Sequence, residues 1–224
     1  MNKTLLLAAA SVIALSAGCA HAAGRPVPSF VGRSNAFRIL KGGKYLYNQN
    51  SHDNGVAVNS QNFTGGSSTT YNDQGADDFV VPSGKTWTVT EVDITGQYYN
   101  GSGPSTSESV MFYKDKNDMP ARPLAKGTFE NLDGGSGPDF ALKLPGKGVQ
   151  LKPGTYWVSV ISNMGFYPSG LWGWEMNNKQ HGNEAMWRNP PGGFGVCPTW
   201  GTLENCIGYS GDLMFTLRGT STDK

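Results

Sequence analysis

The sequence has little charge and no excess of either sign. Only 16% of the 224 residues are charged, and 18 Lys and Arg against 17 Asp and Glu leave a formal net charge of +1. A basic field that attracts nucleic acid and an acidic tail are therefore both excluded, so we expect no nucleic-acid partner. Beyond the N-terminus, no apolar run approaches the roughly 20 residues of a membrane-spanning helix, so we do not expect an integral membrane protein.

The sequence also has few of the charged residues that build helices. In their place it has 31 Gly and 13 Pro, the two weakest helix formers. Its 10 Phe, 9 Tyr and 6 Trp argue against disorder, because disordered chains are poor in aromatic residues. This mixture predicts an all-β protein, an antiparallel β-sandwich of jelly-roll type with long Gly- and Pro-rich loops.

Motifs that carry catalysis are scarce. Apart from one histidine near the N-terminus, the chain holds only His52 and His181, and neither lies in a metalloprotease or hydrolase motif. No P-loop or dinucleotide-binding fingerprint occurs. A glycosidase-type carboxylate pair stays open, with Glu175 and Glu184 as the pair to test and solvated loop carboxylates as the alternative. The sequence predicts a protein without catalytic activity that requires no cofactor.

The N-terminus has the pattern of an export signal. In residues 1–22, Lys3 supplies the positive region, residues 5–17 form the apolar region, and residues 20–22 form an A-x-A cleavage site. We therefore expect an exported protein, extracellular or periplasmic. Cys19 lies in a partial lipoprotein box, so lipid anchoring at Cys19 is the alternative to cleavage after residue 22.

Cysteine is rare, and its spacing is informative. If Cys19 leaves with the signal peptide or is lipidated, the folded part keeps Cys197 and Cys206 alone. Two cysteines close in the sequence of an exported protein predict a disulfide. The alternative is half of a metal site, for which only His52 and His181 remain as further ligands.

The turn and strand signals suggest one domain. We expect residues 23–66 to be an N-terminal extension with one or two edge strands, residues 67–220 to form the sandwich, and residues 221–224 to be a tail. Eight to ten short strands are predicted, with no helix longer than a turn or two. The Pro82–Gly84 segment reads as a turn between two of the strands.

Two strands have a legible apolar pattern. In one, Trp87 and Val89 share a face, but Val92 and Ile94 lie in the opposite phase, which predicts a β-bulge, or alternatively a bend between sheets, around residues 90–91. In the strand that follows residue 154, the alternation of residues 156, 158 and 160 with 157 and 161 predicts two distinct faces.

Loop carboxylates suggest calcium as an inorganic partner. Asp73, Asp77 and Asp78 lie within a seven-residue stretch at a junction of loop and strand, and oxygen ligands of this kind suit Ca²⁺. The alternative is that these side chains cap a turn through bonds to the backbone. Residues 134–139 fit one copy of a calcium-binding β-roll motif, but that fold needs tandem copies, so we interpret them as a Gly-rich turn.

Aromatic residues concentrate in the last third of the chain. Trp172, Trp174, Trp187 and Trp200 lie in a Gly- and Pro-rich region beside several amides, with Glu175 adjacent. Because loops run over surfaces and indole rings stack on sugar rings, these residues are candidate glycan contacts. Packing in the core, or pinning of the loops, is the alternative.

Several motifs together resemble a known family. The run ADDFVVPSGKTWTVTEVDITGQYYNGSGP, followed by LKPGTYWVSV, WGWE, NPPGGFG and GDLMF, resembles a family of uncharacterised exported bacterial β-sandwich modules over roughly residues 70–220. LKPGTYWVSV also resembles, less specifically, the pre-peptidase and proprotein-convertase-associated sandwich domains. The resemblance implies a sandwich fold and export, and it implies no activity.

Three functions are consistent with these observations. The first is a secreted binding module for extracellular or cell-surface polysaccharide, acting through the aromatic loops. The second is a structural or protein-interaction component of the bacterial envelope or extracellular matrix. The third is a glycoside hydrolase or lyase without a recognisable motif.

Overall fold

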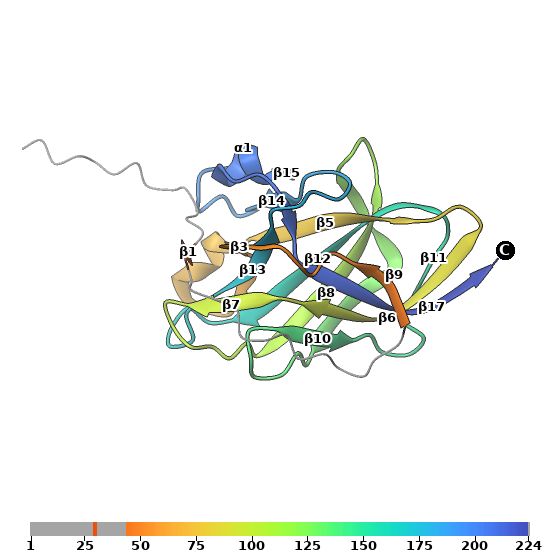
Figure 1. The fold of residues 1–224 in the computed structure, drawn as a ribbon. Helices are drawn as coiled ribbons and strands as arrows, with labels where there is room; N and C mark the ends of the chain where they lie inside the picture. The colour runs from red at the N-terminus through yellow and green to blue at the C-terminus, as the bar shows by residue number, and fades with distance from the viewer. Residues whose placement is uncertain (1–28, 31–43, 224) are drawn as a thin grey trace, which may run out of the picture.

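The computed structural model describes residues 29–30 and 44–223, which are folded almost entirely as strands and turns (Figure 1). In this part of the chain the helices are a 3-10 segment, Gly66–Tyr71, and the five-residue α1, Leu203–Ile207. None of the described helices is long and apolar enough to cross a membrane. The predicted all-β fold is confirmed. The predicted signal peptide and Cys19 lie outside the described residues.

The largest sheet, here the first sheet, has seven strands. In order it contains β15 (Gly201–Thr202), β14 (Met186–Arg188), β5 (Gln74–Val81), β12 (Gly154–Met164), β8 (Ser107–Asp115) and β9 (Pro120–Leu132). The seventh strand, β4 (Gln61–Phe63), pairs in parallel with the end of β12. All other strand pairings in the first sheet are antiparallel.

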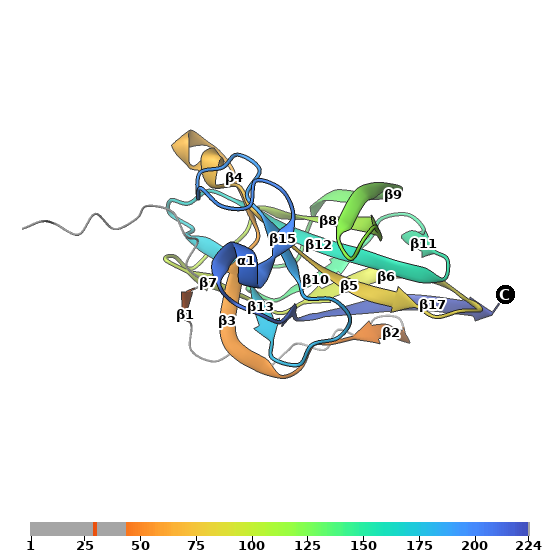
Figure 2. The same ribbon diagram turned by 90° about the horizontal axis from the view of Figure 1, so that it is seen from above.

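Two five-stranded sheets complete the fold. The second sheet contains β10 (Phe140–Lys143), β6 (Lys85–Ile94), β17 (Phe215–Asp223) and β2 (Lys44–Asn48), with β11 (Val149–Leu151) paired to β6. The third sheet contains β1 (Ser29–Phe30), β3 (Asp53–Asn59), β13 (Leu171–Asn177) and β16 (Asp212–Leu213), with β7 (Gly96–Tyr99) paired to β13. Figure 2 shows β8, β9 and β12 in one layer and β17 and β2 in the layer beneath.

The core lies where the three sheets meet. Phe79 of the first sheet contacts Trp87 and Phe215 of the second, with ring centroids 6.3 Å apart in both pairs. Phe215 in turn contacts Trp174 of the third sheet at 6.3 Å. Burial of these large apolar rings supplies much of the driving force for folding, because stability scales with the apolar area removed from water.

The strands β12 and β6, whose apolar patterns carry the predictions above, have the predicted faces. On β12, Val158 and Val160 lie in the main core, whereas Trp157 packs on the opposite face of the sheet. On β6, the pairing with β17 shifts between Arg218 and Gly219, which leaves Thr90 as the additional residue. The predicted bulge is confirmed, and it returns the apolar side chains on both sides of Thr90 to the same core.

The predicted turn at Pro82–Gly84 is also confirmed, whereas the first and last residues of the sandwich differ from those expected. Lys85 N donates to the Pro82 carbonyl at 3.2 Å and closes the predicted turn. Residues 44–63, however, contribute β2, β3 and β4 to three different sheets. The sandwich therefore begins before the expected boundary at residue 66. It also ends after the expected boundary at residue 220, because β17 continues to Asp223.

Candidate functional site

Two of the aromatic residues predicted to bind a ligand, Trp172 and Trp174, lie in the core. Both belong to β13, both are 0% exposed, and they share one face of the strand. Their indole N–H groups donate to the carbonyls of Pro138 and Met214, each at 2.8 Å. Since neither ring offers a face to solvent, the prediction that they stack on a ligand is wrong, and the alternative of core packing holds.

Trp187 and Trp200 differ in exposure. Trp187 is fully buried and donates its indole N–H to the Asn59 carbonyl at 2.9 Å, so it too is a core residue and not a ligand contact. Trp200 is half-buried. Its ring lies 5.8 Å from that of Tyr113 and 4.3 Å from the guanidinium carbon of Arg188. Of the four predicted tryptophans, Trp200 is therefore the one that a ligand can reach.

The two candidate carboxylates serve different parts of the fold. Glu175 is 5% exposed, and burial, more than the neighbouring carboxylates Asp53 and Asp139, raises its pKa to about 8. Glu184 accepts a hydrogen bond from the Glu204 backbone N at 2.8 Å, at the start of α1. Glu175 is thus a buried carboxyl of β13, whereas Glu184 is bonded to the backbone at the start of α1.

The three aspartates predicted to bind calcium also have separate partners. Asp73 Oδ1 accepts from the Gln61 backbone N at 2.7 Å, and Asp77 Oδ2 accepts from the Leu213 backbone N at 2.6 Å. Asp78 accepts from the side chain of Asn183 at 2.8 Å. Within the described residues, no group of three or more His, Cys, Asp or Glu side chains is arranged to hold a metal ion. Asp73 and Asp77 do bond to the backbone, but to distant segments, so they join parts of the fold and do not cap a local turn.

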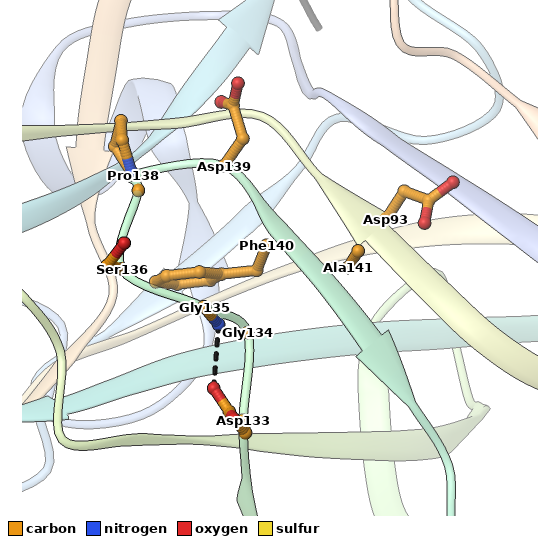
Figure 3. Close-up of a pocket in the computed structure, with 10 residues that line it drawn as sticks. Asp93, Asp133, Gly134, Gly135, Ser136, Pro138, Asp139, Phe140 and Ala141 are labelled. Carbon is orange, nitrogen blue, oxygen red and sulfur yellow. Dashed lines mark hydrogen bonds between the residues drawn. The ribbon is translucent and has the colours of Figure 1, made fainter. Parts of the chain in front are cut away.

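The Gly-rich segment 134–139 lines a hollow of about 400 Å³ together with Asp93 (Figure 3). Asp133 accepts from the Gly135 N at 2.9 Å, and Asp139 accepts from the Gly96 N at 3.1 Å. In Figure 3 the carboxylates of Asp93, Asp133 and Asp139 lie apart and do not converge. This loop behaves as the Gly-rich turn expected from the sequence.

The predicted disulfide between Cys197 and Cys206 is present, with an S–S distance of 2.07 Å. It ties the segment before Trp200 to α1. Gly201 lies against the bridge, and a β-carbon at this position would be 2.8 Å from the Cys206 sulfur. The disulfide therefore fixes the backbone on both sides of Trp200.

The outer face of the first sheet, opposite the core, is the best candidate site. On β8, Ser107, Ser109 and Met111 alternate with residues that point into the core. On β12, Ile161 and Asn163 lie on this same outer face. All five side chains are half-buried, so they form a floor that solvent can reach.

Two adjoining hollows of about 330 and about 400 Å³ cross this face, and we call them together the amide groove. They share Asn62, Ser109, Glu130 and Asn163 as lining residues, so they lie side by side. Most of the lining is amide and hydroxyl, with a few apolar groups and carboxyls: Gln61, Asn62, Thr64, Asn72, Asp73, Gln74, Thr106, Ser107, Ser109, Met111, Glu130, Asn131, Ile161, Asn163, Pro190 and Pro191.

The amides of the groove are held by one another. Asn72 Nδ2 donates to Asn62 Oδ1 at 2.8 Å, and Asn62 Nδ2 donates to Asn163 Oδ1 at 3.0 Å. Asn163 Nδ2 in turn points to the hydroxyls of Ser107 and Ser109, at 3.3 and 3.2 Å. The hydroxyls accept in these bonds, so their own hydrogens remain available to donate to a ligand. The floor is thus rigid and still able to form hydrogen bonds.

A second network connects the groove to Trp200. Gln74 Nε2 donates to the Tyr113 hydroxyl and to Ser159 Oγ, each at 2.8 Å. Gln74 Oε1 accepts from Arg188 Nε at 2.9 Å and from Arg188 Nη2 at 2.5 Å. These bonds hold the guanidinium over the Trp200 ring. Trp200 also lines a separate hollow of about 350 Å³ with Met119 and Pro120.

Comparisons of the chain with protein-family models, with curated proteins and with solved structures found no match. The candidate site therefore rests on the geometry of the described residues.

Sequence reasoning missed the groove residues because each is unremarkable in its own segment. The signal that was present is polar alternation: Ser107 and Ser109 precede Met111 at every second position of β8, and Ser159 and Asn163 flank Ile161 on β12. Such alternation identifies an outer face. It does not show that the outer faces of four strands lie together.

Proposed function

We propose that this protein is an exported, non-catalytic binding module that holds a carbohydrate chain in the amide groove. The observation that carries the proposal is the lining itself, in which amides and hydroxyls from β4, β8 and β12 converge on one solvent-accessible floor. Sugar hydroxyls both donate and accept hydrogen bonds, and amide and hydroxyl side chains can complement both roles.

The rigidity of the groove supports this proposal. A binding site whose side chains are already held in place loses little conformational entropy when the ligand binds. Asn62 and Asn163 are fixed by bonds on both sides, and Gln74 by four bonds. Met111 and Ile161 add apolar patches to the floor, against which the C–H faces of a sugar ring can pack.

Trp200 extends the proposed site. Its half-buried ring is held by Arg188 and Tyr113, and Arg188 is bonded to Gln74 of the groove. A ring fixed in this way is suited to stacking on the apolar face of a sugar. Of the four tryptophans that the sequence offers as candidate contacts, Trp200 is the one that we propose as an aromatic contact.

The carboxyls of the groove favour binding over hydrolysis. A glycosidase needs two carboxyls that flank the scissile bond, about 5–10 Å apart. Among the described lining residues, Glu130 is an exposed carboxylate, whereas Asp73 is 3% exposed and bonded to the backbone of Gln61. This arrangement offers one accessible carboxylate, so it supports a binding role.

Calorimetric titration of the purified protein against a broad oligosaccharide panel tests the proposal. Ser109→Tyr places a ring in the groove and should abolish binding of any oligosaccharide that binds the native protein. Ser221→Tyr is the matched control, because Ser221 is an exposed serine on β17 of another sheet and should leave binding unchanged. No binding across the panel, or equal binding by both variants, would overturn the proposal.

A protein-interaction role is the second candidate, favoured by one loop. Tyr167 is 91% exposed and Phe166 47% exposed, at the tip of the loop that follows β12. The loop is held at its base, where Gly170 N donates to the Phe166 carbonyl at 2.6 Å and Gly103 N donates to the Ser169 carbonyl at 2.9 Å. Pull-down from envelope extracts that is lost in Tyr167→Ala, and kept in Ser109→Tyr, would favour this role over glycan binding.

A further inference from the structure

The shape of the amide groove bears on the length of its ligand. Its two hollows lie side by side with four lining residues in common, and both are open to solvent. Each is near the lower end of the range for a small-molecule site, about 300–1,000 Å³. A closed pocket would select the end of a chain, whereas an open groove made of two adjacent hollows accepts a segment within one.

The groove crosses several strands, which gives it a direction. At one end lie Thr64 and Thr106, and at the other lie Met111 and Pro190. Asn163 stands between the two ends and lines both hollows. An extended ligand that crosses these strands contacts each hollow in turn, so its affinity should grow with the number of its sugar units.

The charge of the groove bears on the chemistry of its ligand. Glu130 is exposed and lines both hollows. Asp73, the other carboxyl of the lining, is buried, and burial raises its pKa well above the ordinary value, which favours its neutral form. Among the described residues that line the two hollows, none is Lys or Arg. An anionic sugar in these two hollows would meet the Glu130 carboxylate. The cations of the extended site lie outside the two hollows, where Arg188 contacts the Trp200 ring and Lys116 lines the hollow of Trp200.

We propose that the amide groove takes an internal segment of a linear, uncharged glycan, and that Glu130 is the residue that rejects anionic chains. This inference rests on the proposed function, because it specifies the ligand of the same site. Amides and hydroxyls satisfy the hydroxyl groups of neutral sugar units, and the Glu130 carboxylate repels the carboxylates or sulfates of acidic polysaccharides.

The test compares affinities within one calorimetric series. Neutral gluco-, xylo- and manno-oligosaccharides, from monosaccharide to hexasaccharide, are titrated beside uronic-acid oligosaccharides of the same lengths. We expect affinity for a neutral series to rise about tenfold or more from the monosaccharide to the longer chains, as successive units fill both hollows. We expect uronic-acid chains to bind more weakly by a similar factor.

Glu130→Gln removes the negative charge and keeps the size of the side chain. The measured quantity is the ratio of neutral to anionic affinity, which should fall about tenfold in this variant. Glu204→Gln is the matched control, because Glu204 is an exposed residue of α1 outside the groove lining, and it should leave the ratio unchanged.

The outcomes separate this inference from the proposed function. Three results would overturn the inference and leave a glycan-binding groove. Uronic-acid chains could bind as tightly as neutral ones, Glu130→Gln could leave the affinity ratio unchanged, or a monosaccharide could bind as tightly as a hexasaccharide. Absence of binding by every oligosaccharide would overturn both.

Discussion

At the scale of single residues, the tryptophans divide by what surrounds their rings. Trp174 lies against Phe215 in the core and has its indole N–H bonded to a carbonyl. Trp200 keeps part of its ring exposed and rests against Arg188 and Tyr113. The first arrangement contributes to stability, whereas the second leaves a surface that a ligand can use.

Alanine variants should separate these two roles. Trp174→Ala should lower the free energy of unfolding by about 3–5 kcal/mol, because it opens a cavity in the core and leaves the Met214 carbonyl without its donor. Trp200→Ala should cost clearly less and should weaken glycan binding. Urea unfolding followed by circular dichroism gives both free energies. Equal losses in the two variants would contradict this assignment of roles.

At the scale of elements, β6 shows what sequence pattern can predict. Trp87 and Val89 precede the change of apolar phase, and Val92 and Ile94 follow it. A strand keeps its core face across such a change only by adding a residue, and Thr90 is that residue. The position of the bulge was predictable because both phases lie within one continuous segment.

The element β13 shows where local pattern fails. The Gly and Pro residues on both sides of Trp172 and Trp174 are typical of loops, so the sequence leaves a surface position and a core position both open for these rings. In the structure β13 is an interior strand, because β3, β7 and β16 all pair with it. Gly173 permits this approach, since a β-carbon there would be 2.8 Å from that of Ala57. Pairing with distant segments decided the burial, and no local signal encodes it.

The loop closed by the disulfide is an element whose contribution can be measured. Cys197 and Cys206 are nine positions apart, so in the chain-entropy model the bond stabilises the fold by about 2–3 kcal/mol. The Cys197→Ser/Cys206→Ser double variant should lose that amount in urea unfolding, and should bind glycan more weakly because the bond fixes the backbone near Trp200. Native protein unfolded with a reductant should show the same loss of stability. Unchanged stability in both samples would contradict the prediction.

At the scale of the whole molecule, the amide groove is a product of topology. Asn62, Asn163 and Ser109 come from β4, β12 and β8, and Glu130 comes from β9. β4, β12 and the consecutive pair β8 and β9 are far apart in sequence, and β4 reaches its place by pairing in parallel with the end of β12. The sequence predicted the sandwich and the two faces of the strand that contains residues 156–161. It could not show which outer faces adjoin, because that depends on strand order.

The buried carboxyl groups contribute a pH dependence of stability whose sign follows from their raised pKa values. Burial raises the pKa of Glu175 to about 8 and that of Asp78 to about 6. Burial likewise raises the pKa values of Asp73, Asp77 and Asp212. The folded chain thus holds these protons more tightly than the unfolded chain, in which the carboxyl pKa values are about 4. The free energy of unfolding therefore falls as the pH rises from the unfolded-state pKa values, about 4, through the raised pKa values of the folded state.

We expect the melting temperature to fall between about pH 5 and about pH 8, with each such group contributing up to about 1.4 kcal/mol per pH unit between its two pKa values. Glu175→Gln removes the group with the highest of the pKa values given above, so the fall between about pH 6 and about pH 8 should be smaller in this variant. Glu204→Gln, on the exposed surface of α1, is the matched control and should keep the native slope. Thermal unfolding across this pH range measures all three proteins. A melting temperature that rises with pH, or identical slopes in the native protein and Glu175→Gln, would show that these carboxyl groups do not set the stability of the fold.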